Sequence, residues 1–146
     1  MTQKRIKEAL DELYVEAKCC LDRGEIPVSA ALLFEDRTEI ISSNQVEQND
    51  DPFAHAEFNV IQEALKQRHT HYLKEATLIV TLEPCLLCLG AILKTGIPDL
   101  YYVLDDPKLG SLSHYHAFVD DKLHVHQIQD ERFQALIDTF FSRLRS

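Results

Sequence analysis

The stretch that decides the fold is "ATLIVTLEPCLLCLGAILKTG", residues 76–96. Its first seven residues, 76–82, are apolar and rich in β-branched side chains, as in a central strand that is buried on both faces. The segment "LLCLGAILKTG" that follows is expected to form a helix. Gly96 closes this helix, because glycine adopts the left-handed conformation of a helix end at little cost. A buried strand followed by a helix indicates an α/β sheet protein.

The rest of the chain continues this alternation of strands and helices. Apolar residues at helical spacing predict an amphipathic helix over 4–22. The segments "VSAALLF" and "TEIISSN", joined by the turn "EDR", predict an antiparallel hairpin over 28–44. We interpret 1–146 as one domain whose later strands are parallel, and leave 111–122 unassigned. The other expected elements are a helix over 54–68, strands over 99–104 and 123–128, and a helix over 130–144.

The composition is that of an ordinary globular domain. The chain has 146 residues, of which 45% are hydrophobic and 27% charged. No apolar run reaches the length of a membrane span, and the N-terminal segment mixes charged and apolar residues, unlike a secretory signal. We therefore expect a cytoplasmic protein, in which the four cysteines are thiols or metal ligands and not disulfides.

The charge argues against a protein that grips nucleic acid through its phosphates. The formal net charge is −9, whereas such proteins usually carry an excess of Lys and Arg on one face. A local basic patch is conceivable if the two ends of the chain come together, although solvated helix faces are the more ordinary interpretation. The basic residues concerned are Lys4, Arg5, Lys7, Arg143 and Arg145.

Two short motifs carry the chemistry, "HAE" at 55–57 and "EPCLLC" at 83–88. Cys85 and Cys88 are three residues apart and share one helix face. With His55 they make three good zinc ligands and leave the fourth tetrahedral position to water, which is the pattern of a catalytic site. The cysteine pair alone is equally typical of a redox pair or of half a zinc ribbon. However, the sequence has no second C-x-x-C pair, and the adjacent Cys19 and Cys20 are interpreted as packing residues.

The spacing of the histidine and the glutamate has a geometrical meaning. Residues i and i+2 of a helix point about 200° apart, so His55 and Glu57 cannot share a site on the side of a helix. They can share one beyond its N-terminal end, because side chains tilt in that direction. His55 would then hold zinc while Glu57 reaches the zinc-bound water. Asp51 and Pro52 are candidates to cap and open this helix, which is expected to start near Ala54.

The combination of H-x-E and P-C-x-x-C resembles the zinc-dependent cytidine and deoxycytidylate deaminase superfamily. Longer stretches are similar to the bacterial tRNA adenosine deaminases, whereas the free-base deaminases for guanine and cytosine share the central motifs but less of the flanks. Two departures are Ser29, where the tRNA enzymes usually have glycine, and Phe53, where a small polar residue is common. The matching stretches are "GEIPVSAALL" (24–33), "DDPFAHAE" (50–57), "ATLIVTLEPCLLCLGAI" (76–92), "DDPKLGSL" (105–112) and "FFSRLR" (140–145).

This resemblance implies a three-layer α/β/α fold with a five-stranded mixed sheet, and a homodimer. It implies hydrolytic deamination with one Zn²⁺ per chain and Glu57 as the proton shuttle. Asn44 is the main candidate for a substrate contact, with Phe53 and the backbone N–H of Ala56 as weaker ones. The site residues that the resemblance implies are the metal ligands His55, Cys85 and Cys88, the catalytic Glu57, and the substrate contacts Asn44, Ala56 and Phe53.

For the substrate we expect a small amino-heterocycle, a free base or a nucleoside. Four aspartates are expected to flank the pocket mouth, where an anticodon loop would bring phosphates. The alternative is a tRNA adenosine deaminase acting at the wobble position. A zinc-stabilised binding module and a thiol redox protein are the alternatives from other classes. The H-x-H pairs at 69/71, 114/116 and 124/126 are interpreted as surface histidines, and the aspartates are Asp50, Asp51, Asp105 and Asp106.

Overall fold

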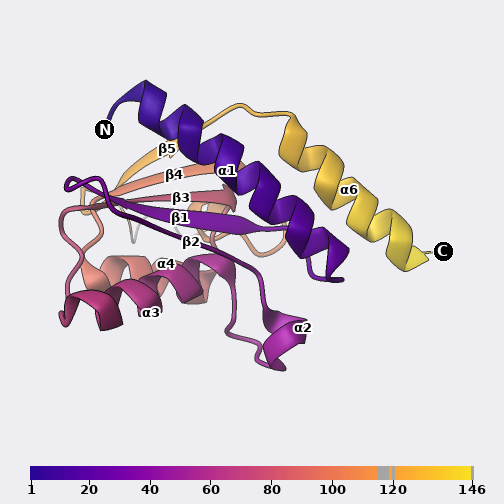
Figure 1. Cartoon of the computed structure of the whole chain (residues 1–146), viewed down its shortest axis with the longest axis horizontal. Coiled ribbons are helices and arrows are strands. Elements are labelled where there is room, and N and C mark those ends of the chain that lie inside the picture. The colour runs from indigo at the N-terminus through magenta and orange to yellow at the C-terminus, as the bar shows by residue number, and fades with distance from the viewer. Residues whose placement is uncertain (115–118, 120, 146) are drawn as a thin grey trace.

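The computed structural model describes residues 1–114, 119 and 121–145, which form a five-stranded mixed sheet with helices on both faces (Figure 1). The strand order is β2-β1-β3-β4-β5. The expected α/β/α layering is confirmed. The elements are α1 (Gln3–Asp22), β1 (Ser29–Phe34), β2 (Glu39–Ser43), α2 (Val46–Asn49), α3 (Ala56–Arg68), β3 (Ala76–Leu82), α4 (Leu86–Thr95), β4 (Asp99–Leu104), α5 (Ser111–His114), β5 (His124–Gln127) and α6 (Arg132–Arg145).

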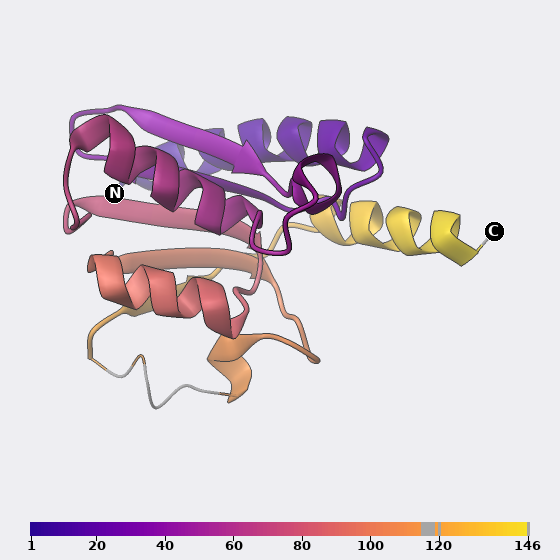
Figure 2. The same ribbon diagram turned by 90° about the horizontal axis from the view of Figure 1, so that it is seen from below.

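Strand direction brings three connecting segments to one edge of the sheet, the edge formed by the C-terminal ends of β2, β3 and β4. β1 is antiparallel to both β2 and β3, so β2 and β3 point the same way. β4 runs parallel to β3, and β5 runs parallel to β4. The segments that follow β2, β3 and β4 therefore leave the sheet at the same edge, where α/β proteins usually bind ligands. α3 and α4 start at this edge and run back along one face of the sheet (Figure 2).

The two central strands are buried on both faces. In β1, Leu32 packs in the cluster that includes α3 and α4, and Leu33 packs in the cluster beneath α1 and α6. Leu78 and Ile79 divide in the same way in β3. These strands are apolar throughout because neither face meets water. The predicted strands and the antiparallel hairpin are confirmed.

The start of α3 differs from its prediction. The helix begins at Ala56, and His55 is its N-cap residue. Asp51 does not cap it, because its Oδ1 accepts a hydrogen bond from the backbone N–H of Phe53 and forms a tight turn instead. The short helices α2 and α5 were not predicted, since four residues are too few for a periodic pattern.

Ser29 has a structural role at the position where glycine was expected. Its side chain is fully buried, and its Oγ donates a hydrogen bond to the carbonyl oxygen of Leu13 in α1, at 2.7 Å. Its backbone N–H donates to Oγ1 of Thr81 in β3. The hydroxyl therefore ties α1 to the sheet, a contact that glycine cannot make.

The basic residues at the two ends of the chain do not form one patch. The N-terminus and the end of α6 lie at opposite ends of the molecule (Figures 1 and 2). Lys4, Arg5 and Lys7 belong to the start of α1, whereas Arg143 and Arg145 belong to the end of α6. Among the helices of the described residues, none is both long and apolar enough to cross a membrane.

The histidine-rich region is only partly described. His116 lies outside the described residues, and His124 and His126 belong to β5. The ring of His126 stacks on that of Tyr101, with ring centroids 4.5 Å apart. None of the histidines in this region joins a metal-ligand group within the described part of the chain.

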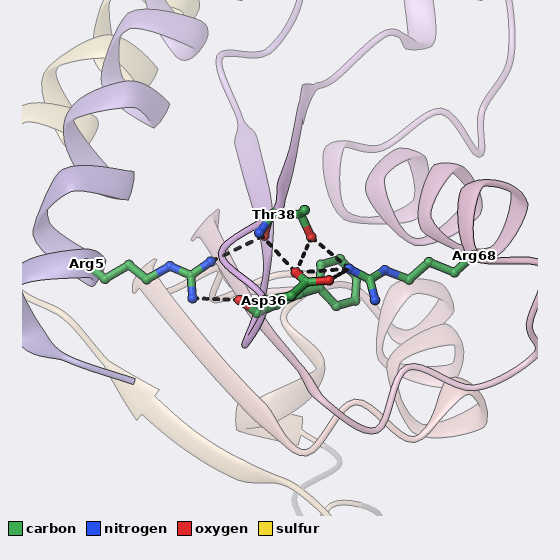
Figure 3. A network of polar contacts seen from close by, with 5 residues as sticks. Arg5, Asp36, Thr38 and Arg68 are labelled. Carbon is green, nitrogen blue, oxygen red and sulfur yellow. Dashed lines mark hydrogen bonds and ion pairs between the residues drawn. The ribbon is translucent and has the colours of Figure 1, made fainter.

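The turn between β1 and β2 is held from both faces of the sheet (Figure 3). From α1, the guanidinium group of Arg5 donates to the carbonyl oxygens of Phe34 and Thr38. From α3, the guanidinium group of Arg68 donates to Asp36 and to the hydroxyl of Thr38, and it lies 3.5 Å from the centroid of the Phe34 ring. The turn thereby connects the helical layers on the two sides of the sheet.

We predict that Arg68→Ala lowers the free energy of unfolding by about 1 kcal/mol, because it removes a stacked cation and its hydrogen bonds to the turn. Urea denaturation measures the change. Lys66→Ala, an exposed residue in the same last turn of α3, is the matched control and should leave the midpoint unchanged. Equal midpoints for the two variants would contradict a stabilising role for Arg68.

Candidate active site

The starts of α3 and α4 lie side by side at the edge of the sheet formed by the C-terminal ends of β2, β3 and β4 (Figure 2). His55 is the N-cap residue of α3 and Cys85 is the N-cap residue of α4, and neither side chain makes a capping hydrogen bond to its own helix. Nδ1 of His55 instead lies 3.6 Å from Sγ of Cys85 and 3.6 Å from Sγ of Cys88. The structure therefore brings together the three residues that the two motifs singled out.

These atoms fit a tetrahedral zinc ion. All three candidate ligand atoms lie within 4.8 Å of one another. Zinc bonds of about 2.3 Å to sulfur and about 2.0–2.1 Å to nitrogen, at tetrahedral angles, place nitrogen and sulfur about 3.6 Å apart. No fourth His, Cys, Asp or Glu of the described residues belongs to the group. The donor set is thus of the three-ligand kind that leaves one coordination position open.

The two cysteines differ in how readily they lose their protons. The pKa of Cys85 is lowered to about 4, because the Cys88 side chain donates a hydrogen bond to its sulfur and His55 lies close by. The pKa of Cys88 is raised, since Cys85 holds the first negative charge of the pair and Cys88 is buried. The interaction with Cys85 also raises the pKa of His55. Without a cation, Cys85 is the thiolate and Cys88 keeps its proton. A divalent metal ion that binds both sulfur atoms would displace this proton.

Glu57 lies in the first turn of α3, close to the candidate metal ligands, and only 4% of its surface is exposed. Burial raises its pKa to about 7, and this outweighs the opposing effects of its own backbone N–H and of His55. A carboxyl group with a pKa near the working pH can both accept and donate a proton, which is the property of a general acid and base.

These groups lie at one end of a pocket of about 150 Å³. His55, Glu57 and Cys85 line it together with Asn44, which is 7% exposed, and Ala56. Most of the exposed lining is apolar, as expected for a site that holds a flat ring. The apolar side chains that contribute are Ile26, Val28, Leu82 and Leu109.

Phe53 is not among the residues that line this pocket. Its side chain is 55% exposed, on the turn that precedes His55. The structure therefore brings Asn44 and Ala56 to the pocket with the candidate metal ligands, but leaves Phe53 outside its walls.

The four aspartates expected at the pocket mouth differ in their contacts. Of the four aspartates, only Asp106 lines the pocket. Asp105 instead accepts hydrogen bonds from Tyr102 and from Gln127 of β5, and Asp51 is engaged by the backbone N–H of Phe53. Side-chain hydrogen bonds turn Asp105 toward β5 and Asp51 into its own turn, which the sequence alone did not reveal.

Five residues that line the pocket were not expected there from the sequence, namely Ile26, Val28, Leu82, Glu83 and Leu109. Glu83 stands directly before Pro84 and is 2% exposed, and Leu109 stands in the segment after β4. A signal for Glu83 is present in the sequence, since it is a charged residue at the end of an otherwise apolar strand. A charged group that is buried there needs hydrogen-bond partners from another segment. No comparable signal marks Leu109, whose side chain is 70% exposed.

The model of the MafB19-like deaminase family matches residues 5–145. The tRNA-specific adenosine deaminase of Aquifex aeolicus is 36% identical over 90% of this chain and 90% of its own length. That of Bacillus subtilis is 33% identical over 92% of this chain and 91% of its own length.

Solved structures agree with this result. One comes from studies of A-to-I editing by tRNA:A34 deaminases and has a TM-score of 0.75 and 34% identity, covering 84% of this chain and 98% of its own. A guanine deaminase from Nitrosomonas europaea, with a TM-score of 0.74, 19% identity, and coverage of 94% of this chain and 83% of its own, shares the fold. The chain belongs to the MafB19-like deaminase family, within the cytidine deaminase-like superfamily.

Proposed function

We propose that this chain is a zinc-dependent hydrolase that removes an exocyclic amino group from a nucleobase-type ring and releases ammonia. One observation carries the proposal: His55, Cys85 and Cys88 converge beside the buried carboxyl group of Glu57 in a ring-sized, largely apolar pocket. The family membership supports the same reaction. The predicted homodimer, the cytoplasmic location and the single domain over 1–146 stay predictions.

His55, Cys85 and Cys88 would hold the metal, with one position left for water. When bound in a three-ligand site, zinc lowers the pKa of its water to about 7. The N-terminal ends of α3 and α4 both face this position, and their positive partial charges favour the two thiolates.

Glu57 would move the protons. It accepts one from the attacking water and passes it to the ring nitrogen beside the carbon that carries the amino group. The water oxygen adds to that carbon as a hydroxyl group. Glu57 then takes the proton of this hydroxyl and gives it to the amino group, so that the carbon–nitrogen bond breaks, ammonia leaves and the ring carbon becomes a carbonyl. Asn44 and the backbone N–H of Ala56 would orient the ring, since both lie on the pocket wall.

Two non-deaminase functions have less support. A zinc-stabilised binding module would use four protein ligands, but among the residues that the structure describes three form the group. A thiol redox protein would not need a histidine shared by both cysteines, but Nδ1 of His55 lies 3.6 Å from the sulfur atoms of Cys85 and Cys88.

For the substrate we propose a free base or a nucleoside. Two features of the charge distribution support this. The net charge is −9, and the basic residues of the chain ends lie apart instead of forming one phosphate-binding face. The pocket of about 150 Å³ accepts a single ring system, and Asp106 at its wall would repel a phosphate.

A tRNA adenosine is the second candidate. It is favoured by the relatives from A. aeolicus and B. subtilis, both named tRNA-specific adenosine deaminases, whose similarity extends over 90% and 92% of this chain. The same residues would act on the ring of either substrate. The two substrates differ only in what they bring to the surroundings of the pocket mouth.

We predict that the purified protein contains one zinc ion per chain and that Cys88→Ser loses it, because a serine hydroxyl is a poor substitute for a thiolate ligand. Elemental analysis by plasma mass spectrometry measures the zinc content. Cys19→Ser is the matched control: Cys19 is exposed on α1 and should have no influence on the metal. Full zinc occupancy in Cys88→Ser would reject this ligand set.

We predict that Glu57→Gln keeps its zinc and its fold but loses deamination by about 10²–10⁴-fold, because the amide cannot transfer protons. Ammonia release and zinc content are measured on the same sample. Glu63→Gln, a surface position on the same helix, should keep wild-type turnover. Loss of zinc from Glu57→Gln would instead make Glu57 a metal ligand.

We predict ammonia release from at least one member of a panel of cytosine, guanine, adenine and their nucleosides. An anticodon stem-loop bearing adenosine is tested beside them at low and high salt, because phosphate contacts make turnover of RNA salt-sensitive. Salt-sensitive turnover of the stem-loop alone would reverse the substrate assignment in favour of tRNA.

A further inference from the structure

Glu83 is a buried carboxylate outside the proposed chemistry. It follows β3 directly, is 2% exposed, and has its backbone N–H paired with the carbonyl oxygen of Leu104. Its Oε1 accepts a hydrogen bond from the backbone N–H of Asp106 at 3.0 Å, and its Oε2 accepts one from the backbone N–H of Ser113 at 2.9 Å. The hydroxyl of Ser113 donates to the same carboxylate. All of these donors belong to the segment that follows β4.

The segment from 106 to 113 is wrapped tightly around this carboxylate. A Cβ atom on Gly110 would lie 2.3 Å from Cδ of Glu83, so only glycine allows so close an approach. The neighbouring Ser111 donates to the carbonyl oxygen of Pro84 through both its backbone N–H and its hydroxyl. Figure 2 shows the segment, which leads into α5, beside the start of α4.

This segment forms one wall of the pocket through Asp106 and Leu109. Leu109 is 70% exposed and lies outside both hydrophobic clusters, so core packing does not fix its position. Its place on the pocket wall therefore depends on the backbone of the segment. That backbone is shaped by the carboxylate of Glu83 and by an internal turn in which Asp106 accepts from the N–H groups of Lys108 and Leu109.

We propose that Glu83 is a positioning residue that holds the segment 106–113 in the shape that places Leu109 and Asp106 against the bound ring. The identity of the ligand in this inference rests on the proposed deaminase function. The way the segment folds around Glu83 is independent of that function. Glu83 would affect how tightly the ring is held, whereas Glu57 would act on the reacting atoms.

The test uses the full chain with Glu83→Gln, in which an NH₂ group replaces one acceptor oxygen and opposes an N–H donor. Hydrogen–deuterium exchange with mass spectrometry should show the amides of peptides covering 105–113 exchanging about tenfold faster or more. With the best substrate of the panel, KM should rise about tenfold while kcat changes less than about threefold. Zinc content should stay at the wild-type value.

Two further variants keep the proposal open to refutation if Glu83→Gln fails to fold. Gly110→Ala pushes a methyl group against the carboxylate from the other side and should give the same exchange pattern and the same rise in KM. Ser113→Ala removes only the hydroxyl donor and should give a smaller change in the same direction. Ile79→Val, in the core beneath α1 and α6, is the control for general destabilisation and should leave KM and the exchange of 105–113 unchanged.

Unchanged exchange of 105–113 in the folded variants would overturn the proposal, as would a fall in kcat with KM unchanged. The exchange measurement needs no turnover. If no substrate is found, faster exchange still supports the role of Glu83 in shaping the wall, and the failure then belongs to the proposed function alone.

Discussion

The constraint on which the site depends is the antiparallel pairing of β1 with both of its neighbours. Because β2 and β3 flank β1 and each opposes it, they point the same way, and the parallel β4 joins them. The helices after β2 and β3 must then begin at one edge, and His55 and Cys85 meet as their N-cap residues. If β1 ran parallel to β3, the two motifs would lie at opposite edges of the sheet and could not share a metal ion.

Glutamates near the pocket are buried for different purposes. Glu25 accepts from the backbone N–H groups of Glu47 and Gln48, and Glu83 accepts from those of Asp106 and Ser113. Glu25 thus holds α2 and Glu83 holds the segment after β4, and in both cases the backbone N–H groups offset the cost of burying a charge. Glu57 lines the pocket itself, and burial raises its pKa to about 7. Similar burial therefore serves structure in two cases, and in the third it gives the carboxyl group the pKa that the proposed proton transfer requires.

The charges near the site show why sequence clusters of one sign must be judged in three dimensions. Four aspartates appear in two pairs along the chain, yet only Asp106 reaches the pocket wall. Conversely, the basic residues of the two chain ends belong to helices that carry them to opposite ends of the molecule. The proposal of a small substrate therefore rests less on acidity at the mouth than on the separation of these two basic groups.

The sequence by itself determined the order of strands and helices, because uniform apolar runs and helical periodicity are local properties. It also identified His55, Glu57, Cys85 and Cys88, since their spacing and side-chain chemistry suit a three-ligand zinc site. Only the tertiary structure decided which other residues reach the pocket. It brought Asn44, Glu83 and Leu109 to its walls and left Phe53 outside them. The wall formed by Glu83 and Leu109 depends on backbone N–H groups of a distant segment that donate to Glu83, and hydrogen bonds between residues 23 and 30 positions apart leave no periodic signal in the chain.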